Sequence, residues 1–199
     1  MTSRSDPPGT GRPRTVPRVE GSPALPMLSP GKQVAFGALA AALTLAATLY
    51  LKVPVSAGGQ YFNLGEAVIY AGALVGGRWI GGAGALGAAL ADLLQGFGAW
   101  APLTLIIKAV EGVLVGALAR PGPWGRDLLA IVPGALWMMA AYAVAAWALL
   151  GPGAVPVELV TDAVQVSTSA LAAVALAPAL RAALRAYLRP YGPPPAQER

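Results

Sequence analysis

Long apolar stretches, separated by short polar or Pro/Gly-rich segments, dominate the chain. An α-helix needs about 20 residues to cross the hydrocarbon core of a bilayer, roughly 30 Å. The pattern predicts an all-α integral membrane protein with six transmembrane helices in a single bundle. The second stretch is only about 18 Å long as a helix, so the loop before it must supplement it. The predicted spans are Gln33–Leu51, Glu66–Gly77, Trp79–Gln95, Ala101–Ala119, Leu128–Leu150 and Val157–Leu180.

The fourth span contains two charged residues, Lys108 and Glu111, inside an otherwise apolar helix. A charge near the centre of a membrane helix costs roughly 2.5 to 3.5 kcal/mol, whereas one aliphatic side chain contributes only about 0.3 to 0.6 kcal/mol. We therefore expect the face that carries Trp100, Thr104, Lys108 and Glu111 to point into the protein. The two charges are three residues apart and can pair. The pair either locks the bundle or lines the path of a ligand, and both interpretations stay open.

The composition supports the membrane assignment: 56% of the residues are hydrophobic and only 12% are charged. A soluble domain of this size would need more charge to cover its surface. The net charge of +5 does not indicate a nucleic-acid partner, because the basic residues lie at span ends and in the tails. If the N-terminus is inside, every Lys and Arg except Lys52 and Lys108 lies on the cytoplasmic side, so both termini are predicted to be cytoplasmic.

The segments outside the spans have a different composition. Residues 1–32 are rich in Pro, Gly, Ser and Arg and are predicted to be a disordered cytoplasmic arm. Residues 190–199 are predicted to be a cytoplasmic tail, which leaves 33–189 as the membrane domain. The segment Lys52–Gly65 contains turn-forming residues and aromatics, so it is predicted to be a loop that could fold back over the bundle.

Polar residues gather at one depth of the predicted bundle, in its outer half. The sixth span carries Glu158, Asp162, Gln165 and Ser169 at a spacing that places them along one helical face. Polar groups between aromatic walls suit a small planar ligand, and the excess of acids favours a neutral or cationic one. Interfacial aromatic belts alone could explain Trp100 and Trp147. The candidate substrate-binding residues are Asn63, Glu66, Asp92, Gln95, Trp100, Thr104, Lys108, Glu111, Tyr142, Trp147, Asp162 and Gln165.

Several enzyme chemistries are excluded by residue type. The chain has no cysteine and no histidine, so it offers no thiol nucleophile, no histidine base and no site of the usual zinc ligands. No metal site and no cofactor are predicted. Gly82, Gly84 and Gly87 spell G-x-G-x-x-G, but no strand precedes them and they lie within a predicted span, which favours close helix packing. The chain also has no Walker-type lysine motif.

Small residues form a ridge on the first span, where Ala38, Ala42 and Ala46 are four residues apart. Such small-xxx-small patterns let membrane helices approach closely. The ridge could serve packing inside the bundle, or it could face outward and contact another membrane subunit.

Two runs, FNLGEAVIYAGALVGG and GALGAALADLLQGFGAWAPLTLIIKAVEGVLVG, resemble the substrate-binding S components of energy-coupling factor (ECF) vitamin transporters. The resemblance covers about Pro54–Gly116, with weaker support from DAVQVSTSA in the sixth span, and is strongest to a branch with predicted hydroxymethylpyrimidine or pyridoxine members. Its most specific positions include Asn63, Glu66, Asp92, Thr104 and Lys108.

The resemblance implies a six-helix plasma-membrane subunit, not an enzyme, that captures a vitamin or precursor such as hydroxymethylpyrimidine, thiamine or pyridoxine near its outer face. It implies two kinds of partner, a membrane T component and two cytoplasmic ATPases, with Ala38, Ala42 and Ala46 matching the family's T-component contact. Transport in the family is thought to involve toppling of the S component. Two other functions remain open: a self-sufficient proton-coupled carrier that uses Glu111 and Asp92, and a small lipid-modifying membrane enzyme that uses carboxylates.

Overall fold

Helices lie at all six ranges that the apolar pattern predicts. The computed structural model describes residues 28–54 and 61–188, which form six α-helices, two short strands and a 3-10 turn. The predicted tail and nearly all of the predicted arm lie outside the described residues. The elements in chain order are α1 Pro30–Tyr50, β1 Lys52–Pro54, β2 Tyr61–Asn63, α2 Gly65–Gly76, α3 Arg78–Leu94, α4 Ala101–Leu118, α5 Trp124–Leu150, η1 Pro152–Ala154 and α6 Val155–Leu188.

Local sequence explains where the helices break. Pro30 occupies the first turn of α1, where its missing N–H leaves no hydrogen bond unmade. Gly77, with φ of 83°, separates α2 from α3, and Gly151, with φ of 90°, ends α5. Few side chains tolerate this left-handed region, so the two glycines set the tight connections.

The segment between α1 and α2 differs from its prediction as a loop. β1 and β2 pair in antiparallel fashion, with Lys52 opposite Asn63 and Val53 opposite Phe62. The described part of the chain is mostly helical, as predicted, and this short hairpin replaces part of the predicted loop. Each strand is only three residues long, and the pairing joins residues on either side of a Pro/Gly-rich stretch, so neither run had a recognisable strand pattern. The pairing places Asn63 two residues before the start of α2 at Gly65.

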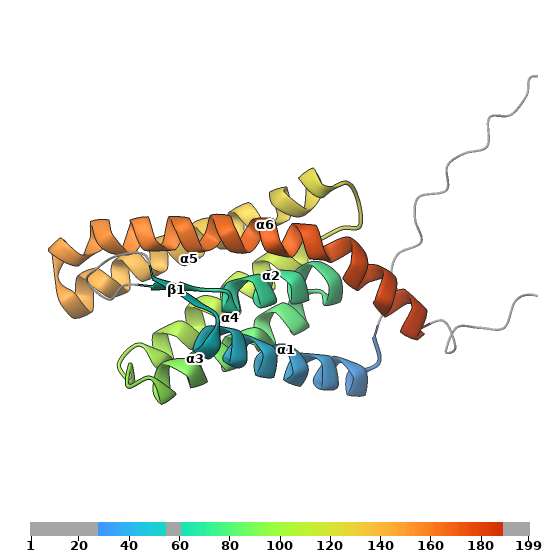
Figure 1. Ribbon diagram of the computed structural model, residues 1–199, viewed down its shortest axis with the longest axis horizontal. Helices are drawn as coiled ribbons and strands as arrows, with labels where there is room; N and C mark the ends of the chain where they lie inside the picture. The colour runs from blue at the N-terminus through green and yellow to red at the C-terminus, as the bar shows by residue number, and fades with distance from the viewer. Residues whose placement is uncertain (1–27, 55–60, 189–199) are drawn as a thin grey trace, which may run out of the picture.

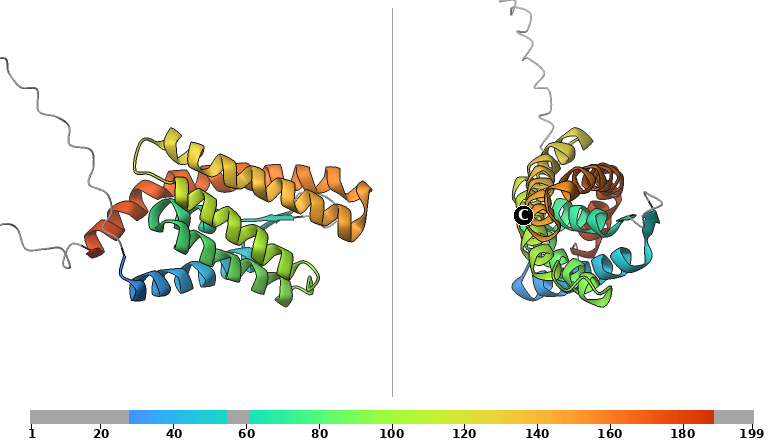
Figure 2. Two further views of the ribbon diagram at one scale, coloured as in Figure 1. Left: turned by 180° about the vertical axis from the view of Figure 1, so that it is seen from behind. Right: turned by 90° about the vertical axis from the view of Figure 1, so that its left-hand side faces the viewer.

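The short helix α2 lies at the centre of the bundle. Figure 1 shows α5 and α6 along one side and α1 and α3 along the other, with α2 and α4 between them, and Figure 2 gives the view from behind and from one end. Ile69, Tyr70, Ala73 and Leu74 of α2 are almost fully buried. They pack against Val115 of α4 and against small and aliphatic side chains of α5 and α6.

Glycine allows the closest helix approaches. A Cβ on Gly112 of α4 would overlap the backbone of Gly81 on α3, and a Cβ on Gly87 would overlap the carbonyl of Ala41 on α1. Within the G-x-G-x-x-G run, Gly84 likewise faces Ile69 and Thr44. The geometry supports the packing interpretation of this run, in which glycine lets neighbouring backbones meet.

We expect Gly87→Val to destabilise the bundle by about 3 kcal/mol, because the new side chain must push α1 away from α3. Thermal unfolding in detergent measures the loss. Gly153→Ala is the matched control, since nothing lies within 4 Å of a Cβ there. Equal melting temperatures for the two variants would contradict this account of the α1–α3 contact.

Four of the helices in the described part of the chain, α1, α4, α5 and the helical stretch from η1 through α6, are long and apolar enough to cross a membrane. The helices α2 and α3 are shorter, at 12 and 17 residues. Large apolar side chains such as Leu43, Leu86, Leu129 and Leu171 are at least half exposed, as expected for surfaces that face lipid. Six complete spans and cytoplasmic termini remain predictions.

A buried ion pair closes the end of the bundle where α1 begins and α6 ends. Arg181 on α6 donates to both carboxylate oxygens of Asp127 on α5, at 2.8 and 2.7 Å. The same guanidinium donates to the carbonyl oxygen of Leu74, near the end of α2, at 3.2 Å. Bidentate pairing of this kind fixes geometry as well as charge, so three helices are joined at this end.

Candidate functional site

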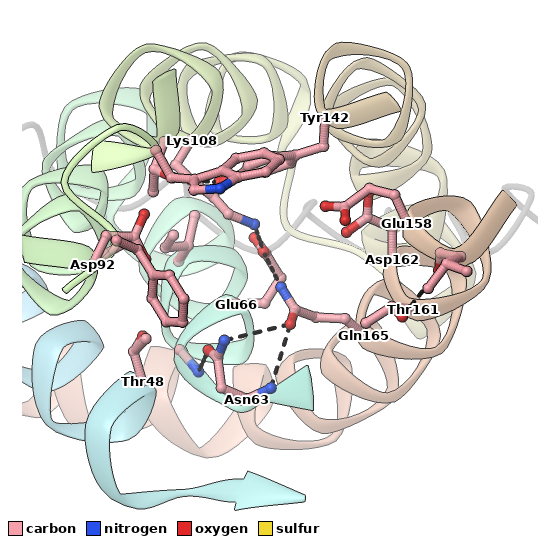
Figure 3. A pocket seen from close by; sticks show the side chains of 17 residues that line it. Thr48, Asn63, Glu66, Asp92, Lys108, Tyr142, Glu158, Thr161, Asp162 and Gln165 are labelled. Carbon is pink, nitrogen blue, oxygen red and sulfur yellow. Dashed lines mark hydrogen bonds and ion pairs between the residues drawn. The ribbon is translucent and has the colours of Figure 1, made fainter. Parts of the chain in front are cut away.

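A cavity of about 330 Å³ opens at the opposite end of the bundle (Figure 3), the end at which α3 ends and α4 and α6 begin. Each of the six helices contributes to its wall, as do β2 and the α3–α4 turn. Its volume lies in the range of small-molecule sites. The residues on its wall are Thr48, Asn63, Gly65, Glu66, Ile69, Ala88, Asp92, Phe97, Trp100, Thr104, Lys108, Tyr142, Val157, Glu158, Thr161, Asp162 and Gln165.

A buried ion cluster forms the inner end of the cavity. Lys108 of α4 pairs with Glu66, in the first turn of α2, and its Nζ lies 3.5 Å from Oε2 of Glu111. The hydroxyl of Tyr70 donates to Oε1 of Glu111 at 2.7 Å. None of these side chains is more than 6% exposed. Charges this far from water persist only when they are paired, so the cluster fixes α2 against α4.

An amide network links the same cluster to the β-hairpin and to α6. Nε2 of Gln165 donates to Oε2 of Glu66 at 3.3 Å. Oε1 of Gln165 accepts from the backbone N–H of Asn63 at 3.3 Å and lies 3.4 Å from the side-chain nitrogen of Asn63. Oδ1 of Asn63 accepts from the N–H of Gly65, at the start of α2, at 3.0 Å. Helix α1 also comes close here, because a Cβ on Gly65 would overlap the side-chain hydroxyl of Thr48 and lie 3.3 Å from the carbonyl oxygen of Thr44.

Aromatic side chains cover another part of the wall. The rings of Trp100 and Tyr142 lie 6.2 Å apart between centroids, and Phe97 also lines the cavity. The hydroxyl of Tyr142 donates to Thr104 at 3.0 Å, and Nζ of Lys108 lies 5.4 Å from the centre of the Tyr142 ring. A planar solute would find apolar ring faces here and polar groups on the other walls.

Nine of the twelve predicted site residues line this cavity, and Figure 3 shows several of them facing one hollow. Three do not. Gln95 accepts a hydrogen bond from Lys52 of β1 and donates to the carbonyl of Ala91 at 3.0 Å. Glu111 lies behind Lys108 and is completely buried, and Trp147 is 60% exposed on the outer surface of α5. The positions of these three side chains therefore do not support direct contact with a ligand in the cavity.

Sequence reasoning left several wall residues out of the predicted site, although two could have been found. Glu158 lies one helical turn before Asp162, and Thr161 lies one residue before it. Both therefore belong near the polar stripe on α6 and could have been included in the prediction. Thr48 and Ala88 gave no such signal, because Thr and Ala are common in membrane helices. Phe97 lies in the uncharged α3–α4 turn and enters the wall through the path of that turn.

The described residues contain no group of three or more acidic side chains arranged to hold a metal ion. The acids on the cavity wall come instead from separate helices: Glu66 from α2, Asp92 from α3, and Glu158 and Asp162 from α6. The arrangement suits binding of an organic solute through hydrogen bonds and charge.

A comparison with known protein families identifies the family to which this chain belongs. Residues 30–182 match the family described as the ECF-type riboflavin transporter, S component. The chain belongs to this family. It is the substrate-binding subunit of an ECF transporter, hence a multi-pass membrane protein of a transporter family and not of an enzyme family. The matched region includes all six helices up to the last turns of α6.

A curated relative adds a second similarity. The S component is 39% identical over 120 residues to a protein of Pyrococcus woesei described as "Uncharacterized protein in gap 3'region". The alignment covers 59% of this chain and 80% of the relative. The family description names riboflavin, so the predicted hydroxymethylpyrimidine or pyridoxine branch remains a prediction.

Proposed function

We propose that this S component captures a small vitamin or vitamin precursor in the cavity lined by Glu66, Asp92, Lys108 and Asp162. It then passes the solute to an ATP-driven import complex in the plasma membrane, made with a T component and two ATPase subunits. The observation that carries the proposal is the cavity itself. Charged and amide side chains from four helices converge there, at one end of a bundle whose outer surface is apolar.

The exposed alanine ridge supports the partner assignment. Ala38, Ala42 and Ala46 are all exposed, whereas Gly37 and Thr44 on the other side of α1 are buried. A ridge of small side chains that the bundle leaves uncovered suits close contact with a helix of another membrane protein. The T component is the partner proposed for it.

The two ends of the bundle suit different steps of import. The cavity lies at the end that the charge pattern predicts to be extracellular, and the Arg181–Asp127 pair closes the other end. Solute could therefore enter from outside while the cytoplasmic end stays closed.

Reconstitution in liposomes tests the proposal. The S component, the T component and both ATPases should together import radiolabelled riboflavin, thiamine or pyridoxine when ATP is supplied inside, and the S component alone should import none. Uptake by the purified chain alone, driven by a proton gradient, would favour the carrier that uses Glu111 and Asp92. Turnover of added phospholipid would favour a membrane enzyme.

We expect Asp92→Asn to weaken binding of the imported vitamin at least tenfold, because Asp92 lines the wall opposite α6 and the variant removes its charge. Equilibrium binding to detergent-purified protein measures the change. Gln95→Glu, one turn further along the chain but off the cavity wall, is the comparison and should keep the affinity within about threefold. Unchanged affinity for Asp92→Asn would assign Asp92 a purely structural role.

A further inference from the structure

The charges around the cavity do not balance. Among the residues that the structure describes, its wall carries four carboxylates, Glu66, Asp92, Glu158 and Asp162, and a single ammonium group, that of Lys108. Lys108 already contacts Glu66 and, behind the wall, Glu111. The ammonium group of Lys108 therefore already pairs with two carboxylates in the absence of a solute. The other three carboxylates on the wall have no basic side chain beside them on that wall.

Two carboxylate oxygens on the wall are buried and have no hydrogen-bond partner in the described part of the chain. They are Oε1 of Glu66 and Oδ2 of Asp162. Glu66 is 1% exposed and Asp162 is 6% exposed. Oε2 of Glu66 accepts from Lys108 and Gln165, so Oε1 is the oxygen of Glu66 that still lacks a donor. Buried acceptors without partners are costly, and they occur where a ligand completes them.

Both residues line the cavity, Glu66 from α2 and Asp162 from α6. Glu158 and Asp162 are one turn apart on α6 and face the cavity together, while Asp92 lies across it on α3 (Figure 3). The aromatic part of the wall, formed by Trp100 and Tyr142, borders the same space. The site therefore offers aromatic ring faces that can contact a planar part of a ligand. Next to them it offers carboxylates that can pair with a positively charged part of the same ligand.

We propose that the solute of this S component is an organic cation: a small heteroaromatic ring that carries a positively charged nitrogen, with that nitrogen held between Glu66 and Asp162. The inference rests on the proposed function and specifies the substrate class of its site. An anion would meet the wall carboxylates with only an already paired lysine to attract it. A neutral solute could donate hydrogen bonds to the two free oxygens but would leave their charge unbalanced in a buried site.

Two matched sets of probes test the charge directly. Pyridoxamine, pyridoxine and 4-pyridoxate share one ring and differ at a single substituent, which is an ammonium, a hydroxyl or a carboxylate. Thiamine carries a permanent positive charge on its thiazolium ring, and 3-deazathiamine, in which carbon replaces the charged ring nitrogen, is its neutral counterpart of the same size. Calorimetric titration of detergent-purified protein should show, in every set of which a member binds, that the cation binds at least tenfold more tightly than its neutral relative. The anionic member should bind more weakly still.

Variants then locate the positive group. Asp162→Asn should reduce the preference for the cation over its neutral relative at least tenfold. Thr161→Val changes a neighbouring wall residue without changing charge, and it should alter the affinities of both probes by similar factors. Melting temperatures of both variants show whether the fold is intact. A cation preference unchanged by both Asp162→Asn and Glu66→Gln would overturn the placement.

The outcomes separate this inference from the proposed function. A neutral or anionic probe that binds as tightly as its cationic relative overturns the substrate class. Import of riboflavin by the reconstituted complex, with no binding of any cation, overturns the substrate class and keeps the role as an S component. If no probe binds and the complex imports nothing, both the substrate class and the proposed function are wrong.

Discussion

Lys108→Ala is expected to produce the largest loss of stability among single substitutions at the site, about 3 to 5 kcal/mol. The ammonium of Lys108 pairs with Glu66 and lies 3.5 Å from Glu111, and both carboxylates are almost completely buried. Removing it leaves two buried acids without a positive neighbour in the cluster and removes the ion pair that joins α2 to α4. Ligand binding should fall at least tenfold, because Glu66 and Lys108 both line the cavity. Thermal unfolding in detergent and equilibrium binding measure the two effects.

A second substitution distinguishes charge from packing. Lys108→Met combined with Glu66→Gln keeps similar volumes and removes one charge of each sign, so it should recover part of the stability that Lys108→Met loses alone. Lys52→Ala is the control, since Lys52 contacts Gln95 outside this cluster and is only partly buried. A melting temperature that changes as little for Lys108→Ala as for Lys52→Ala would contradict the importance of the buried cluster.

Ala42→Trp is expected to abolish assembly with the T component while solute binding stays within about twofold of the unmodified protein. Ala42 is exposed at the middle of the alanine ridge on α1, and the cavity wall does not include it. A large ring at this position would hold any partner helix away from the close distance that small residues permit. Co-purification of the tagged S component with the T component and both ATPases measures assembly.

Ala140→Trp provides the matched control for the ridge, because Ala140 is an exposed alanine on α5, a different helix of the bundle. It should leave co-purification intact. Normal assembly of Ala42→Trp, or equal loss for both variants, would show that the ridge is not the contact surface.

Much of the fold could be predicted because the sequence signal of a membrane helix lies within the helix itself and at its ends. Long apolar runs and the glycines near their ends mark each helix without knowledge of any partner. The pairing of Lys108 with Glu111 was predictable for the same reason, since residues three apart on a helix are neighbours. The β-hairpin was not, because strand pairing depends on residues that are distant in the chain and its strands are very short.

The candidate site shows where local reasoning stops. The contact of Lys108 with Glu66 joins residues 42 positions apart, and nothing in either local sequence signals it. Depth along the membrane could be estimated from sequence, but the rotation of α3 and α5 about their own axes could not. Trp147 therefore shared a predicted depth with Tyr142 yet lies on the outer face of α5, and Gln95 turned toward Lys52 instead of the cavity.

Attachment at both ends of α2 has a mechanical consequence. Glu66 in its first turn is bound to α4 and α6, and the carbonyl of Leu74 near its last turn is bound to Arg181. A helix restrained twice in this way cannot slide or tilt alone, so its amide protons should exchange with deuterium among the slowest in the protein. Among the described elements, α2 is therefore not expected to act as a hinge between the two halves of the bundle. Reorientation of the domain as one unit, the movement that the resemblance to ECF S components implies, would need no such hinge.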